Sequence, residues 1–195
     1  MEKIFLFLYP IREYFNSLTK DDNSLVILNE TIKKRYKDKG YKIICVQYPD
    51  KEIYGIDKRI INNVIYTDIS FKEHVTKTKD GNYKYPNEKI ILKELINSSE
   101  IIIGGFHYGD CVKRVGEQAL ELGLNCIVDL DLTDLFFNLY NTEYFDQCNY
   151  NPQNFKEYMI NKMNRYNDEL TQRIFKRNYS SPVYGIYNNE IERKL

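Results

Sequence analysis

Short apolar runs alternate along this chain with segments whose apolar residues recur at helical spacing. The apolar runs lie at residues 3–8, 42–47, 63–68, 100–105 and 125–129. The segments with helical spacing lie between them, at residues 24–39, 87–98 and 110–122. Alternation of this kind predicts a mainly parallel β-sheet covered by helices, so the fold class is α/β.

Individual residues place some of these elements. The run from Lys3 to Leu8 is apolar without alternation, which is typical of a central strand buried on both faces. Ser24 and Gly40 are suited to cap the two ends of the first predicted helix. The polar segment 77–86 predicts an exposed loop. We expect residues 1–150 to form one α/β domain.

The chain becomes polar and rich in Tyr and Asn beyond Asn151. Apolar side chains still recur there at helical spacing, at Phe155, Met159, Met163, Tyr166 and Leu170. This stripe predicts a long terminal helix within a C-terminal helical extension, residues 151–195. We expect the extension to pack on the domain or on a subunit partner, without involvement of a cofactor.

Composition narrows the range of partners. The 195 residues carry 28 Lys and Arg against 28 Asp and Glu, and this zero net charge argues against nucleic acid or an anionic membrane as partner. The longest apolar runs, residues 4–9 and 101–105, are far shorter than the roughly 20 residues of a membrane helix. The four cysteines include no C-x-x-C pair, so we expect no zinc site, no disulfide scaffold and a cytoplasmic location.

The segment Gly104–Val112 carries the sharpest chemical signal. It lies between a predicted buried strand and the start of a helix, where open α/β sheets form their clefts. Cys111 falls in the first helical turn, where the helix dipole and backbone N–H groups stabilise a thiolate. Cys111 is therefore either a nucleophile or a small buried residue of the core. We expect the substrate-binding residues to include Phe106, His107, Tyr108 and Asp110.

The polar residues around Cys111 allow several interpretations. His107 could act as a base for the thiol, but more often such a residue only completes a turn. Asp110 is expected to cap the helix through its carboxylate. Asp129, Asp131 and Asp134 could hold a metal together with His107, although acidic residues spaced along a loop are usually just solvated. We predict neither a metal nor another cofactor.

A glycine-rich turn for phosphate binding is a further alternative. Gly104, Gly105 and Gly109 lie between a strand and a helix, as in a dinucleotide site. The spacing lacks the third glycine of that motif, and no Lys-Ser pair of a P-loop is present. A rossmannoid nucleotide-binding domain thus remains the main alternative for the fold.

The segment Gly105–Val112 resembles the G-x-x-T-x-x-C-V motif of the isochorismatase-like cysteine hydrolases. The similarity continues to Gly123, twelve residues after Cys111, and to a strand that reaches Asp129 and Asp131. It covers roughly residues 88–136. The resemblance implies a three-layer α/β domain, a cytoplasmic homo-oligomer, and hydrolysis of an amide or vinyl ether in a small-molecule substrate.

The resemblance also implies a cysteine nucleophile, an aspartate that ends the first strand, and a lysine. Cys111 matches the nucleophile, whereas the aspartate position falls on Tyr9 or Pro10, neither of which is a carboxylate base. Glu13 would supply one only if the chain were shifted. Lys77, Lys79 and Lys84 lie where the lysine is expected, and we select Lys79. Tyr9 is then expected to line the substrate site.

The sequence therefore leaves two main hypotheses for function. The first is a cysteine hydrolase acting on a small amide or related metabolite, with Cys111 as nucleophile. The second is a relative of that fold that has lost hydrolysis and serves as a small-molecule-binding or assembly module. The aspartate missing from the first strand favours the second, and the cysteine segment favours the first.

Overall fold

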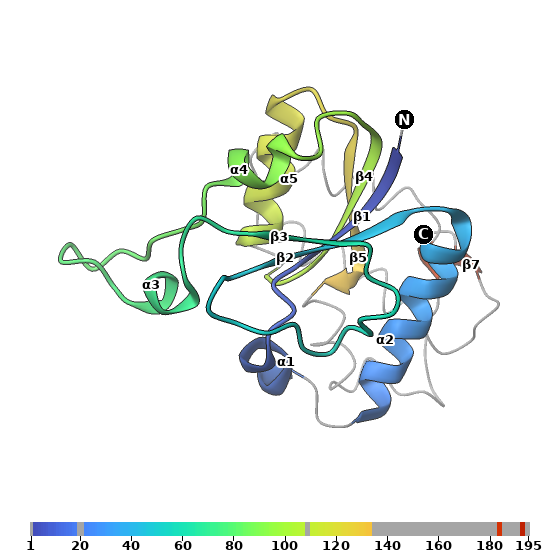
Figure 1. The fold of residues 1–195 in the computed structure, drawn as a ribbon, viewed down its shortest axis with the longest axis horizontal. Coiled ribbons are helices and arrows are strands. Elements are labelled where there is room, and N and C mark those ends of the chain that lie inside the picture. Colours follow the sequence, from blue (N-terminus) through green and yellow to red (C-terminus); the bar gives the residue numbers. More distant parts are fainter. Residues whose placement is uncertain (1, 19–21, 108–109, 134–182, 185–191, 194–195) are drawn as a thin grey trace.

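The computed structural model describes residues 2–18, 22–107, 110–133, 183–184 and 192–193. Its core is a five-stranded, entirely parallel sheet with the strand order β3-β2-β1-β4-β5 (Figure 1). The strands are β1 (Glu2–Leu8), β2 (Lys42–Gln47), β3 (Asn63–Tyr66), β4 (Ser98–Gly105) and β5 (Cys126–Thr133). The predicted α/β class and the central position of the first strand are both confirmed.

Helices cover both faces of this sheet. They are α1 (Arg12–Leu18), α2 (Asp22–Arg35), α3 (Phe71–Val75), α4 (Glu88–Lys93) and α5 (Cys111–Glu121), with a short 3-10 turn at Lys37–Lys39. Figure 1 shows α2 on one side of the sheet and α4 and α5 together on the other. The result is a three-layer α/β/α domain, as predicted. A separate antiparallel pair consists of β6 (Val183–Tyr184) and β7 (Glu192–Arg193).

Element boundaries depart from the sequence prediction in several places. The first long helix begins at Asp22, so Ser24 lies inside it, while Gly40 ends the following turn in the left-handed conformation (φ 82°). The helix predicted over 87–98 ends at Lys93, because β4 already begins at Ser98. The last strand, predicted to end at Asp129, extends to Thr133. The helix predicted near residues 155–176 lies outside the described residues.

Two short helices were not predicted. Helix α1 begins two residues after Pro10 and buries Phe15, whose ring centre lies 4.9 Å from that of Phe106. Helix α3 is held at its start by Asp50, which accepts hydrogen bonds from the backbone of Phe71 and Lys72. Helices this short owe their stability to tertiary contacts more than to intrinsic propensity, so the hydrophobic period gives little sign of them.

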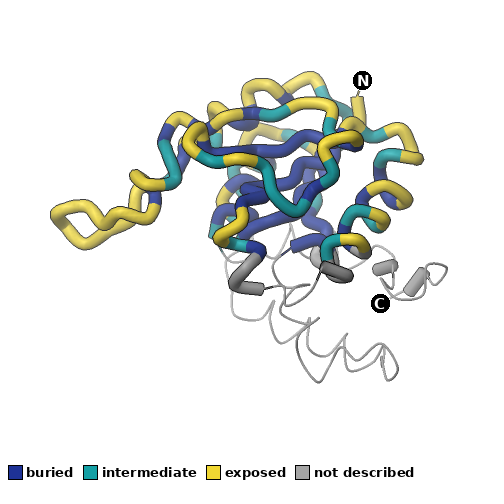
Figure 2. The backbone as a smooth tube through the Cα atoms, turned by 60° about the horizontal axis from the view of Figure 1, so that its bottom comes forward, coloured by how far each residue is buried: buried dark blue, intermediate teal, exposed yellow. Residues whose placement is uncertain are grey.

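A polar arm at residues 76–86 extends from the body of the protein, as the exposed loop in Figure 2 shows. Its tip is a turn in which Gly81 donates to the Thr78 carbonyl and Thr78 donates to the Asn82 carbonyl. The expectation of an exposed loop at 77–86 is confirmed.

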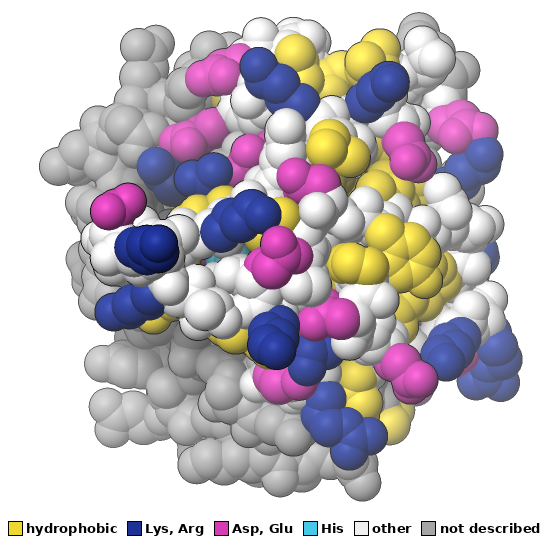
Figure 3. Space-filling model, turned by 60° about the vertical axis from the view of Figure 1, so that its left-hand side comes forward, with side chains coloured by type: hydrophobic (Ala, Val, Ile, Leu, Met, Phe, Trp, Pro, Cys, Tyr) yellow, Lys and Arg dark blue, Asp and Glu magenta, His cyan; other side chains and the backbone are white. Residues whose placement is uncertain are grey.

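The surface mixes charge and apolar side chains. On the face shown in Figure 3, Lys and Arg alternate with Asp and Glu, and hydrophobic side chains lie exposed between them. Over the described part of the chain, each helix is too short or too polar to cross a membrane. Within the same residues, no cluster of His, Cys, Asp and Glu has the grouping of a metal site.

Candidate functional site

The candidate site lies where the three central strands end. Tyr9 follows β1, Tyr48 follows β2, and Phe106 follows β4, so parallel pairing brings all three to one edge of the sheet. The backbone N–H of Tyr9 donates to Val46 and that of Phe106 donates to Leu8, which ties these segments to neighbouring strands. Cys111 then starts helix α5 above the same edge.

The structure brings most of the predicted site residues together. Tyr9 and Phe106 are fully enclosed, and His107 lies against the ring of Tyr14 at 4.5 Å. The peptide bond between Phe106 and His107 is cis. Tyr108 lies outside the described residues.

Cys111 is 5% exposed, and its surroundings work against ionisation. Burial raises the pKa of the thiol well above its ordinary value, and the charge of Asp110 raises it further. The guanidinium of Arg114 acts in the opposite direction, while Glu88 adds to the increase. The helix N-terminus alone favours a thiolate, but the enclosed and acidic surroundings outweigh it here. The thiol is therefore protonated at neutral pH.

Four tyrosines lie close enough to the thiol for its charge to affect their pKa, and sequence reasoning found only Tyr9 among them. Burial is the largest cause of the raised pKa of Tyr9, Tyr14, Tyr48 and Tyr85, and the charge of Cys111 contributes in every case. The Tyr9 and Tyr48 rings stack at 4.6 Å. We refer to these four residues as the tyrosine cluster. Phenols can donate and accept hydrogen bonds, so the cluster is a polar, neutral environment.

A repeated Tyr-Pro dipeptide in the sequence marks three members of the tyrosine cluster. Three of its members precede a proline, in the dipeptides at residues 9–10, 48–49 and 85–86. The first two directly follow strands β1 and β2, and the third precedes helix α4. Proline ends the strand in each of the first two cases because it has no N–H for the ladder. The repeated Tyr-Pro pair therefore marks tyrosines at element ends, which is where this fold collects its site.

The hydroxyl of Tyr48 has no hydrogen-bond partner among the described residues, although the side chain is completely buried. Its ring is fixed by Tyr9, by Phe71 at 5.5 Å and by His74 at 5.6 Å. Its polar neighbour is the Tyr14 hydroxyl, and the interaction between the two phenols raises the pKa of Tyr48 and lowers that of Tyr14. A buried polar group in this state costs free energy unless another molecule supplies the partner.

Removal of the Tyr48 hydroxyl tests whether this group lacks a hydrogen-bond partner in the folded protein. We expect Tyr48→Phe to leave the free energy of unfolding unchanged or to raise it by up to about 1 kcal/mol, because no hydrogen bond is lost. The matched control is Tyr36→Phe, since the Tyr36 hydroxyl donates to the buried carboxylate of Asp129. That variant should lose about 1.5–3 kcal/mol. Urea denaturation measures both, and an equal loss in the two variants would contradict the assignment.

An ion pair closes one side of the site. The Nε of Arg114 on α5 donates to Oε1 of Glu88 on α4 at 2.6 Å, and the guanidinium lies 4.4 Å from the centre of the Tyr85 ring. Sequence reasoning missed both residues, because nothing in their spacing shows that α4 and α5 pack side by side. This pair places one carboxylate near Cys111, with its charge already engaged by arginine.

The predicted lysine lies away from the other site residues. Lys79 is exposed near the tip of the polar arm. Lys77 lies over the Tyr83 ring at 5.5 Å, and Lys84 pairs with Glu73 at 3.2 Å. Glu13, the alternative acid, is exposed on α1 and pairs with Lys51, which lowers the pKa of its carboxyl group. His74, the second histidine, is buried with Nδ1 2.7 Å from the Lys84 carbonyl.

Two expectations about acidic residues are wrong. Asp110 precedes α5 but makes no capping hydrogen bond through its side chain, because the His107 carbonyl already accepts from the N–H of Val112. Asp129 is not a solvated loop residue. It is buried in β5, where the guanidinium of Arg35 donates to it at 2.7 Å.

The glycine pair of the cysteine segment has a packing role. A Cβ on Gly104 would stand 2.7 Å from the Leu132 carbonyl oxygen, and one on Gly105 would stand 2.3 Å from that of Leu8. Both glycines let β4 approach its neighbours closely. Their presence between strand and helix is therefore explained without a bound phosphate.

Fold and site together define an α/β protein with a buried cysteine at the carboxyl edge of a parallel sheet.

No family model matches the chain, and no curated protein matches it. Similar solved structures include the pyrazinamidase of Pyrococcus horikoshii, at 12% identity over 85% of this chain and 96% of that one, with a TM-score of 0.48. PnC1 of L. infantum is 13% identical over 68% and 80%, with a TM-score of 0.46. A protein described as an isochorismatase family protein is 14% identical over 73% and 95%, with a TM-score of 0.43. The latter carries the name of the family that the cysteine segment resembles.

Proposed function

We propose that this protein is a small-molecule-binding relative of the isochorismatase-like hydrolases that has lost the hydrolytic step. One observation carries the proposal: Tyr9 and Pro10 follow the first strand, where the resemblance requires an aspartate, and neither is a carboxylate base. A phenol with a raised pKa does not accept a proton from a thiol at neutral pH. The proton of Cys111 therefore has no base to receive it from this strand.

The environment of the thiol supports the same proposal. An activated cysteine needs a nearby cation or base that lowers its pKa. Here burial, Asp110 and Glu88 all raise the pKa of Cys111, and they outweigh Arg114 and a backbone hydrogen bond, which lower it. Because Arg114 also pairs with Glu88, its charge is partly neutralised.

The tyrosine cluster suits binding more than catalysis. Its rings supply apolar contact area, and its hydroxyls supply hydrogen-bond donors and acceptors of no net charge. The unpartnered Tyr48 hydroxyl offers one such group inside the site. A small uncharged molecule with its own polar atoms would fit this chemistry.

A cysteine hydrolase acting on small amides is the second candidate, and the position of Cys111 favours it. The residue begins helix α5, and a hydrogen bond from its own backbone lowers the pKa of the thiol, which is the kind of donor that an oxyanion requires. Under this alternative, ammonia should be released from small primary amides such as acetamide, benzamide or nicotinamide. Under the proposal, no release above the Cys111→Ser background is expected.

The pH dependence of alkylation provides the direct test. Since the pKa of Cys111 is raised, its reaction with iodoacetamide should be slow at pH 7 and should still increase with pH above 9. Peptide mass spectrometry follows each cysteine separately. Cys45 serves as an internal control, because burial alone raises its pKa to about 12. A rate that reaches its plateau below pH 8 would show an activated nucleophile and overturn the proposal.

A variant of Asp110 tests whether the charge of this residue raises the pKa of Cys111. Asp110→Asn removes the largest electrostatic contribution to the raised pKa of Cys111, so alkylation at a fixed pH of 8 should become faster. Asp38→Asn is the matched control, because Asp38 pairs with Lys33 on the exposed surface. Equal rates for the two variants would show that access to the sulfur, not its ionisation, limits the reaction.

The location and assembly of the protein belong to the same proposal. Cys45, Cys111 and Cys126 are all free thiols, which supports a reducing, cytoplasmic environment. We also expect a homo-oligomer. Sedimentation analysis tests that expectation directly.

A further inference from the structure

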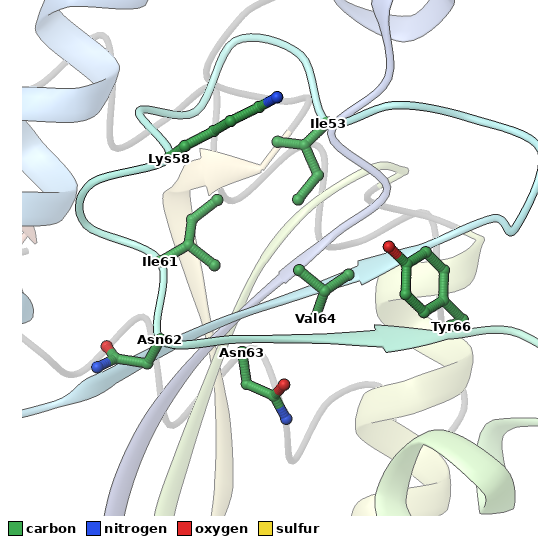
Figure 4. A pocket seen from close by; sticks show the side chains of 7 residues that line it. All are labelled: Ile53, Lys58, Ile61, Asn62, Asn63, Val64 and Tyr66. Atoms are coloured by element: carbon green, nitrogen blue, oxygen red, sulfur yellow. The ribbon is translucent and has the colours of Figure 1, made fainter.

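A hollow of about 490 Å³ lies beside the edge strand β3, on a part of the molecule that the candidate site does not use. Strands β2 and β1 separate β3 from β4, which leads to Cys111. The hollow is formed by β3 and the loop before it, and its lining residues are Ile53, Lys58, Ile61, Asn62, Asn63, Val64 and Tyr66 (Figure 4). Its size is within the usual range for small-molecule sites.

The walls combine an apolar interior with polar groups at the rim. In Figure 4, Ile53, Ile61 and Val64 point toward one another, while Lys58 and the Tyr66 hydroxyl lie around the same space. The amide of Asn63 is turned away from it. A ligand here would place apolar atoms against the aliphatic side chains and a polar group near the ammonium.

The charge of Lys58 is available to a ligand. No carboxylate among the described residues lies within ion-pair distance of its ammonium. The residues on either side of Lys58, by contrast, form an ion pair with each other. Asp57, the adjacent acid, is engaged by Arg59 at 2.7 Å. An unpaired ammonium beside an apolar wall favours an anion that carries apolar atoms.

The loop that forms the hollow is fixed in place before any ligand binds. Asn62 accepts hydrogen bonds from the Ile43 backbone and from Lys37, each at 2.9 Å. The Asn29 side chain holds the same loop by donating to the Gly55 carbonyl and accepting from the N–H of Asp57, both at 2.7 Å. A preorganised wall spares a ligand the entropic cost of ordering it.

From these observations we propose that the hollow beside β3 binds a small apolar molecule that carries one carboxylate. The aliphatic residues contact its apolar part, the ammonium of Lys58 pairs with the carboxylate, and the Tyr66 hydroxyl donates a second hydrogen bond to it. This site is independent of the tyrosine cluster and of the fate of Cys111.

Titration of the full chain with hexanoate and 1-hexanol, followed by ¹H–¹⁵N NMR, tests the proposal. Hexanoate should shift the amide signals of residues 58, 61 and 64–66, and 1-hexanol should bind about fivefold more weakly, as expected for loss of one partly exposed ion pair. Lys58→Gln should weaken hexanoate binding about fivefold and leave hexanol binding unchanged. Lys93→Gln, which alters an exposed lysine on α4, should change neither.

Four results would each overturn the proposal. Equal affinity of the protein for hexanoate and 1-hexanol would show that the carboxylate is not recognised. Hexanoate affinity unaffected by Lys58→Gln, or signal shifts centred on residues 107–115, would place the ligand elsewhere. The protein could also fail to bind hexanoate and instead self-associate in a way that Val64→Glu abolishes. That result would show that a second copy of the chain covers the hollow. Because the signals of the two sites are separate, failure here leaves the proposal for Cys111 unaffected.

Discussion

Asp129→Ala is expected to lower the free energy of unfolding by about 3–5 kcal/mol, as measured by urea denaturation. The carboxylate of Asp129 and the guanidinium of Arg35 are each only 7% exposed and pair at 2.7 Å. The substitution leaves the Arg35 charge buried without this counterion, which is the costly state for an ion pair in a protein interior. The pair also joins α2 to β5, which lie far apart in the sequence.

Two further variants separate the cost of a buried charge from a general loss of packing. Asp38→Ala breaks an exposed ion pair with Lys33 and should cost less than about 1 kcal/mol. The double variant Arg35→Met with Asp129→Leu removes both charges and should recover most of the loss of Asp129→Ala. A double variant as unstable as the single one would show that the charges themselves stabilise the fold.

Gly105→Ala is expected to lower the free energy of unfolding by about 3 kcal/mol or more. A Cβ at this position would lie 2.3 Å from the carbonyl oxygen of Leu8 and 2.6 Å from its nitrogen. The backbone of β1 at the centre of the sheet would have to move, and overpacking of this kind costs about 1–3 kcal/mol. The positive φ of 100° adds about 1–2 kcal/mol for a residue with a side chain.

Gly123→Ala isolates the second of these contributions. Gly123 also has a positive φ, 75°, but a Cβ there would meet nothing within 4 Å. The variant should therefore lose only about 1–2 kcal/mol in the same urea experiment. If the two glycine variants were equally destabilised, close packing between β1 and β4 would not be the reason for glycine at residue 105.

The chemistry at Cys111 depended on contacts that the sequence does not show. The segment 104–112 correctly indicated a cysteine at a strand-to-helix junction. Glu88 and Arg114 were not found, because their pairing requires α4 to pack on α5. Tyr14 and Tyr48 were missed for a similar reason, since only the packing of α1 and the strand order of the sheet bring them near Cys111.

The sequence by itself determined the type of each long element and the class of the fold. Continuous apolar runs predicted β1, β2 and β4, and glycines marked the ends after α2 and α5. The apolar runs at residues 42–47 and 125–129 contain Cys45 and Cys126, and both side chains are buried in the structure. These properties are local, because hydrophobic period and the conformational freedom of glycine act within a few residues.

Only the tertiary structure decided which polar residues are buried and what they contact. Asp129 resembles a solvated acid in the sequence, yet Arg35 and Tyr36 enclose it. Helices α1 and α3 form because Phe15 and Asp50 find partners elsewhere in the chain. The pKa of Cys111 follows in the same way from burial and from charges on two helices. Burial and electrostatic interaction depend on distance in space, which sequence separation does not give.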